Sequence, residues 1–163
     1  MRLLAALALL SLASLASCVG ELVADQISTE VSLSSAGQPG DVVEVRKRFR
    51  FSHDPRDARG VYFTRGRVAI LSPSAADLRY LHRVEILVVD PATEEEVVVA
   101  TAEDIAPGDR VVPLYIDFAE DLRPFASDDS RVTFVFRLQG NAWAPLPAEG
   151  LTFLASATIE IDL

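Results

Sequence analysis

Cysteine is almost absent from this 163-residue sequence, since Cys18 is the only one. No intramolecular disulfide is therefore possible, and a disulfide-stapled fold is excluded. The two histidines, His53 and His82, are too few for a convincing zinc site. G-x-S-x-G, H-E-x-x-H and phosphate-cradling glycine motifs are also missing, so the sequence predicts neither catalysis nor a cofactor.

Basic residues are outnumbered by acidic ones, 15 against 24, and the formal net charge is −9 at pH 7. This acidic balance argues against a nucleic-acid partner, because nucleic-acid binders neutralise phosphates with Lys and Arg. Long apolar runs are missing too. The longest, Leu3–Ala16, has about 14 residues, whereas a membrane-spanning helix needs about 20.

The first 18 residues have the features of a secretory leader. Arg2, the apolar run and the small residues that follow it are typical of a signal peptide. Leu15-Ala16-Ser17-Cys18 resembles the lipobox of bacterial lipoproteins, in which the chain is cut before the cysteine and the cysteine sulfur receives a diacylglycerol. The alternative is an ordinary secretory signal in which the cysteine falls at this position by chance.

The resemblance implies that residues 1–17 are a signal peptide and that Cys18 is lipidated. The membrane is then a partner, because two or more acyl chains hold a protein stably at a bilayer. The implied location is the bacterial cell envelope. Val19 follows Cys18 where an aspartate would favour inner-membrane retention, so the outer membrane is favoured if the source has two membranes.

After the leader, apolar and polar residues mostly alternate with a period of two. The pattern is clear from Ile27, from Val43 and from Val132, and it is longest in 151–163. Such alternation predicts half-buried antiparallel strands. The segment 83–89 is apolar on both faces and predicts a central strand. We expect an all-β, antiparallel two-sheet sandwich, immunoglobulin-like or jelly-roll-like, resembling small β-sandwich lipoproteins of unassigned role.

Three segments follow from this pattern: the leader at 1–17, the lipidated cysteine with a short tether at 18–26, and a sandwich domain at 27–163. At most one short helix is expected, near 74–82, with Ser74 as its N-cap. A tether of about eight residues reaches no more than about 30 Å. The domain should therefore lie close to the bilayer.

Positive charge is concentrated in residues 46–83, which hold ten of the 15 basic residues. The main interpretation is that these arginines form cross-strand pairs with acidic strands such as the one that begins at Glu94-Glu95-Glu96. The alternative is a basic stripe that binds lipid headgroups, an anionic glycan or an acidic protein. Its candidate residues are Arg46, Arg48, Arg50, Arg65 and Arg67.

Two loops hold the remaining candidate residues. His53, Asp54 and Asp57 are a weak metal candidate, because ordinary turn chemistry explains them equally well. Trp143, in the 140–150 connection, either folds back to plug the open end of the sandwich or binds a ligand. We favour the plug.

Three hypotheses for function remain. The first is a non-enzymatic, lipid-anchored envelope protein with a binding or scaffolding role, whose partner is another envelope protein. The second is a glycan- or ligand-binding module that uses the 140–150 loop. The third is a hydrolase with a pair of carboxylates that the sequence alone does not reveal.

Overall fold

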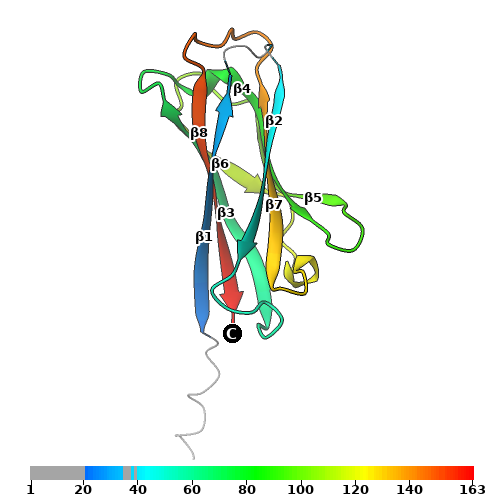
Figure 1. The fold of residues 1–163 in the computed structure, drawn as a ribbon. Helices are drawn as coiled ribbons and strands as arrows, with labels where there is room; N and C mark the ends of the chain where they lie inside the picture. The colour runs from blue at the N-terminus through cyan, green and yellow to red at the C-terminus, as the bar shows by residue number, and fades with distance from the viewer. Residues whose placement is uncertain (1–20, 35–37, 39) are drawn as a thin grey trace, which may run out of the picture.

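The computed structural model describes residues 21–34, 38 and 40–163, and its regular elements are almost all strands (Figure 1). The segments in which apolar and polar residues alternate are therefore strands, as the sequence predicts. The strands are β1 (Leu22–Leu33), β2 (Val42–Arg50), β3 (Gly60–Ser72), β4 (Leu81–Val89), β5 (Glu96–Glu103), β6 (Val111–Ile116), β7 (Arg131–Gly140) and β8 (Leu151–Asp162).

These eight antiparallel strands form one sheet in the order β1-β8-β3-β6-β5-β4-β7-β2. The sheet curls into a nearly closed barrel, because its two edge strands, β1 and β2, approach each other along an open seam. Lys47 on β2 reaches across this seam, and its Nζ donates to the carbonyl oxygen of Ser28 on β1 at 2.5 Å. Two half-barrels face each other, β1-β8-β3-β6 and β5-β4-β7-β2.

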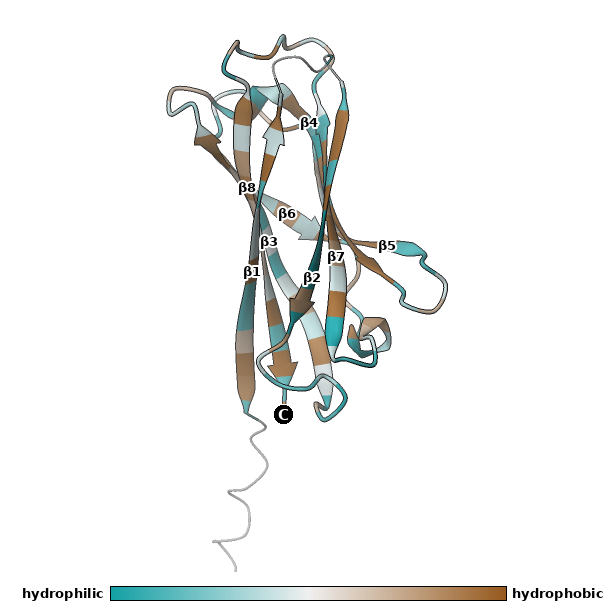
Figure 2. Cartoon of the chain, viewed as in Figure 1, coloured by the Kyte–Doolittle hydropathy of each residue, from teal (hydrophilic) through white to brown (hydrophobic). Residues whose placement is uncertain are grey.

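The core fills the space between the two half-barrels. The inward positions of β8 are buried from Leu151 to Ile161, which confirms the predicted alternation. Strand β4 is buried on both faces from Val84 to Val89, as expected of a central strand. Figure 2 shows the brown, hydrophobic bands that recur along the strands. Burial of this apolar area is the main stabilising term.

Strand β1 begins at Leu22, earlier than the predicted start at Ile27. Residues 22–26 lack clear apolar alternation, but they form a ladder with the end of β8, beginning with Leu22 opposite Asp162. Backbone pairing therefore extends the strand where side-chain periodicity does not. Residues 22–26, which were predicted as part of the tether, therefore belong to β1, and residues 18–20 lie outside the described part of the chain.

The short helix expected near 74–82 is a single 3₁₀ turn, Leu78–Tyr80. Its N-cap is Asp77, so the assignment of Ser74 as N-cap is wrong. A second 3₁₀ turn, Arg123–Phe125, was not predicted. Proline near its start suits the fixed φ of a first helical turn. No helix in the described part of the chain is long and apolar enough to span a membrane.

Asp77 joins two loops and gives the first testable prediction. Its carboxylate accepts from the backbone N–H of Arg79 and of Gly108, both at 3.0 Å. It also forms an ion pair with the Arg79 guanidinium at 2.6 Å, and the side-chain hydrogen bond from Arg79 lowers the pKa of Asp77 well below its usual range. Asp77→Ala should therefore lower the free energy of unfolding by about 1 kcal/mol at pH 7.

The pH dependence of this loss has a definite sign. A depressed carboxyl pKa stabilises the folded state above the unfolded pKa of about 3.9, and that stabilisation disappears as pH falls through the folded value. Urea unfolding at pH 7 and pH 3 should show the difference between wild type and Asp77→Ala shrinking at pH 3. Asp109→Ala is the control, because Asp109 bonds Leu78 through its backbone carbonyl alone. An equal loss in both variants would contradict the prediction.

Candidate functional site

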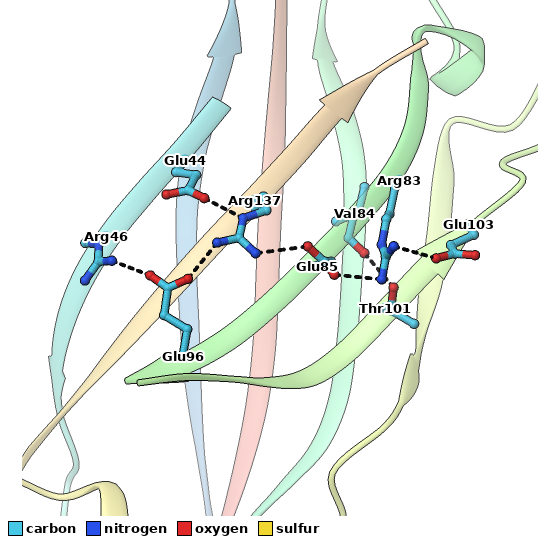
Figure 3. A network of polar contacts seen from close by, with 9 residues as sticks. All are labelled: Glu44, Arg46, Arg83, Val84, Glu85, Glu96, Thr101, Glu103 and Arg137. Carbon is cyan, nitrogen blue, oxygen red and sulfur yellow. Dashed lines mark hydrogen bonds and ion pairs between the residues drawn. The ribbon is translucent and has the colours of Figure 1, made fainter. Parts of the chain in front are cut away.

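A network of ion pairs crosses the outer face of the half-barrel β5-β4-β7-β2 (Figure 3). Arg137 on β7 is its centre. The Arg137 guanidinium contacts Glu44 on β2 at 2.5 Å, Glu96 on β5 at 2.6 Å and Glu85 on β4 at 3.3 Å. The network joins all four strands of this half-barrel.

The network extends on both sides of Arg137. On one side, Arg46 forms an ion pair with the second oxygen of Glu96. On the other, Arg83 contacts Glu85 at 2.8 Å and Glu103 at 3.1 Å. The carboxylate hydrogen bonds, led by that of Glu44, raise the pKa of Arg137 further above its usual range. These carboxylates therefore neutralise arginines and hold the sheet together.

The predicted pairing of the basic segment with the acidic strand β5 is confirmed for Arg46, which contacts Glu96, and for Arg83, which contacts Glu103 directly across from it. Arg48 and Arg50 are exposed on the same strand and form no ion pair among the described residues. Arg137, the centre of the network, was not among the candidate residues predicted from the sequence. Its role depends on Glu44, Glu85 and Glu96, which come from three other strands and meet only in the folded barrel.

The basic stripe does not form as a single surface. Arg46, Arg48 and Arg50 lie on β2, whereas Arg65 and Arg67 lie on β3 in the opposite half-barrel. The physical reason is the topology, because β2 and β3 follow each other in sequence but belong to different halves. Arg65 and Arg67 instead line a hollow of about 110 Å³ on the outer face of β3 and β8.

The loop of His53, Asp54 and Asp57 is held by an arginine. Asp54 binds the Arg56 guanidinium at 2.7 Å and accepts from the Ser130 hydroxyl at 2.8 Å. The side-chain hydrogen bond from Arg56 lowers the pKa of Asp54 well below its usual range. His53 contacts Ser52 through Nδ1. Among the described residues, no three histidine, cysteine, aspartate or glutamate side chains converge as a metal site.

Trp143 is 92% exposed, so the prediction that it plugs the end of the sandwich is wrong. A turn held at its base presents the side chain to solvent. Asn141 donates to the carbonyl of Arg79 and accepts from the backbone N–H of Trp143, both at 3.0 Å. The Asn141 backbone N–H also bonds the Tyr80 carbonyl at 2.7 Å. These bonds fix the turn against the 3₁₀ turn Leu78–Tyr80, which precedes β4, and the indole stays in solvent.

A cleft of about 160 Å³ opens beside this turn, at the end of the seam between β1 and β2. The cleft combines apolar side chains with hydroxyl and amide groups and contains no basic residue. Its lining is Ser32, Leu33, Ser34, Gln38, Gly40, Asp41, Val43, Gly140, Asn141 and Leu146. Sequence patterns gave no signal for this cleft, because the lining comes from four separate segments.

The two ends of the barrel differ in what they present (Figure 1). At the Leu22 end, β1 begins beside the C-terminal residues of β8. At the Trp143 end, the 141–150 loop leads into the first residues of β8, which pair with the last residues of β1. The exposed tryptophan and the start of the domain therefore lie at opposite ends of the barrel.

Comparison with known proteins identifies no family. No family model matches the chain, and no curated protein matches it. One solved structure, of Desmodium yellow mottle tymovirus, is 11% identical over 87% of this chain and 88% of that chain, with a TM-score of 0.31. Another, from a study of promiscuous specificity in carbohydrate-binding modules of the beta-sandwich superfamily, is 15% identical, with a TM-score of 0.35. The alignment covers 88% of this chain and 56% of that one, so the chain spans about half its length.

Proposed function

We propose that this chain is a non-enzymatic binding module, anchored to a bacterial membrane through lipid on Cys18, that contacts an envelope protein through Trp143. Cys18 lies outside the described residues, so the anchor rests on the lipobox resemblance. The single observation that carries the binding role is the 92% exposure of Trp143 on a turn held by Asn141. Tryptophan is enriched among the residues that dominate binding energy at interfaces.

The position of Trp143 supports this role. If lipid on Cys18 holds the protein, the Leu22 end faces the bilayer and the Trp143 end faces away from it. A partner in the envelope therefore reaches the indole without displacing lipid. Hydrogen bonds already order the turn in the free protein. Binding therefore costs little conformational entropy of this turn.

The absence of catalysis is also part of the proposal. The carboxylates that gather on the outer face, Glu44, Glu85 and Glu96, are all bonded to Arg137. A general acid or base needs a carboxyl that reaches the substrate. These carboxylates are occupied in holding four strands together, and a structural role accounts for them.

The fold supports the jelly-roll alternative within the proposed sandwich. The half-barrel orders are β1-β8-β3-β6 and β2-β7-β4-β5. Apart from the β4–β5 hairpin, each connection passes from one half-barrel to the other. This alternation is typical of an eight-stranded jelly roll, whereas an immunoglobulin sandwich has the orders A-B-E-D and C-F-G.

Photo-crosslinking in native membranes tests the proposed contact. A photo-reactive residue at Ala142, which is exposed next to Trp143, should capture an envelope protein. Trp143→Ala should reduce capture about 30-fold, because interface tryptophans often contribute at least about 2 kcal/mol. Trp143→Phe is the matched control and should retain part of the yield. Equal capture with and without Trp143 would contradict the proposal.

A glycan is a second candidate ligand for the Trp143 end. The observation that favours it is the cleft of about 160 Å³ beside the turn, with its hydroxyl and amide groups. A sugar ring stacks on an indole and hydrogen-bonds to such groups. Screening wild type and Trp143→Ala on a glycan array separates the candidates. Trp143-dependent glycan binding without a crosslinked protein favours the second.

A further inference from the structure

We propose that Arg65 and Arg67 form a binding site for an acidic polysaccharide on the outer face of the half-barrel β1-β8-β3-β6. The site is a shallow hollow of about 110 Å³, lined by Gln26, Arg65, Arg67, Ser156, Ala157 and Thr158. Its residues are separate from the 141–150 loop. The proposal therefore stands independently of the function proposed for Trp143.

A β-bulge directs both arginines to the outer face. The pairing of β3 with β8 shifts by one residue between Phe63 and Arg65. Phe63 points into the core before the shift, and Gly66 and Val68 are the buried positions after it. Without the extra residue, the strict alternation of a strand would direct the arginines into the core. Bulges of this kind re-aim side chains and are common beside binding sites.

The backbone at Gly66, between the two arginines, packs closely against core side chains on the inner face of β3. Gly66 lies over the core, and a Cβ at this position would meet the Phe63 ring at 3.1 Å and Leu114 Cβ at 3.3 Å. The strand therefore sits directly on its core residues. Arg65 and Arg67 stand two positions apart on this support, so their guanidinium groups share one side of the sheet.

These two arginines lack the acidic partners that others have. Arg46, Arg83 and Arg137 each bind at least one glutamate. Among the described residues, neither Arg65 nor Arg67 forms an ion pair, and Arg67 donates from Nε to the neutral Ser156 hydroxyl at 3.1 Å. Two positive charges are therefore available to an anion on this face of an acidic protein.

The residues that pair across β1, β8 and β3 form rows perpendicular to the strands. On the outer face, the nearby glutamates lie in other rows than Arg65 and Arg67. Glu160 lies opposite Tyr62, and Glu30 lies opposite Leu154. Arg65 lies opposite Thr158 and Arg67 opposite Ser156. Carboxylates thus border the hollow along the strands without entering its lining. The charge of the hollow itself is positive.

The rows through the two arginines contain neutral hydrogen-bonding groups. Thr158 lies opposite Arg65 on one side and Gln26 on the other, and Ser156 lies opposite Arg67 and Ser28. Arginine binds a carboxylate through two parallel hydrogen bonds. Hydroxyl and amide side chains match the hydroxyl groups of a sugar. The combination fits a sugar that carries a carboxylate better than it fits a bare anion.

An exposed aromatic side chain borders the same face. Tyr115 on β6 is 80% exposed. Gly66 lies opposite Leu114 and Arg67 opposite Pro113, so Tyr115 projects on the arginine side of β6. A ring in this position offers a surface on which a sugar stacks. Four strands at about 4.8 Å spacing make the face long enough for several sugar units.

Isothermal titration with polygalacturonate tests the site. We expect binding to wild type that weakens as NaCl is raised, because exposed charges are screened by salt. Arg65→Gln/Arg67→Gln should lower the affinity at least about tenfold. The matched control is Arg50→Gln/Arg59→Gln, which removes the same charge from exposed arginines without ion pairs among the described residues. This control should bind within about twofold of wild type.

Further arms define the ligand class. Methyl-esterified polygalacturonate has the same backbone without the charge and should bind at least about tenfold more weakly. Trp143→Ala should not change the affinity, which separates this site from the Trp143 end. An equal loss in both double variants, or equal binding of the methyl ester, would overturn the proposal. Polyglutamate or anionic vesicles binding as tightly as polygalacturonate would overturn its saccharide part, and an absence of polygalacturonate binding would overturn it entirely.

Discussion

Replacing Arg137 with methionine should lower the free energy of unfolding by about 2–4 kcal/mol. Arg137 is the common partner of Glu44, Glu85 and Glu96. Removing one partner of a buried ion pair costs about 3–5 kcal/mol, because a charge is left without compensation. The side chain of Arg137 is 27% exposed, so water offsets part of this penalty. Methionine preserves much of the volume and isolates the effect of the charge.

Glu85 is the most buried carboxylate of the network, with a side chain only 10% exposed. When Arg137 is removed, it keeps a single ion-pair partner, Arg83. Glu44 is 38% exposed and regains water more easily. Adding Glu85→Gln to Arg137→Met should therefore restore only about 1 kcal/mol, because it removes the buried charge but also takes one of the two carboxylate partners of Arg83, which keeps Glu103.

Urea unfolding of the single and double variants measures both effects. Arg48→Met is the matched control, because Arg48 is exposed on β2 and forms no ion pair among the described residues. Its cost should stay within about 0.5 kcal/mol. If Arg137→Met lowered the free energy of unfolding by no more than Arg48→Met, the network would contribute nothing measurable to stability, as is true of many exposed ion pairs.

The features that could be predicted from the sequence are those determined by the side-chain pattern within a single strand. The alternation of β8 and the two-faced burial of β4 follow from side-chain periodicity, and both are present. The outward direction of Arg65 and Arg67 needed the bulge after Phe63, which the apolar pattern reflects but does not locate. The start of β1 at Leu22 depends on pairing with Asp162, a contact between opposite ends of the chain.

The candidate sites were harder to predict, because they assemble from distant segments. The Arg137 network combines four strands that are adjacent only through the sheet order. Trp143 was expected to fold back and plug the open end of the sandwich. Its turn is instead fixed by the side-chain amide of Asn141, which donates to the Arg79 carbonyl and accepts from the backbone N–H of Trp143. The hydrogen-bonded turn therefore keeps the Trp143 side chain in solvent, although a hydrophobic side chain would by itself favour burial.

Cys18→Ser should remove the protein almost completely from the membrane fraction. Serine lacks the sulfur nucleophile that accepts the diacylglycerol in the lipoproteins that residues 15–18 resemble. Detergent phase separation and mass spectrometry of the mature chain measure the result. Val19→Ser is the control and should partition like wild type.

The start of β1 at Leu22 shortens the tether that the proposed lipid anchor would have. Residues 19–21 span no more than about 11 Å when fully extended, instead of the roughly 30 Å expected from the longer tether. If Cys18 is lipidated as proposed, the Leu22 end of the barrel should lie close to the headgroups. Unchanged detergent partitioning of Cys18→Ser, with the leader still processed, would contradict the anchor and with it this orientation.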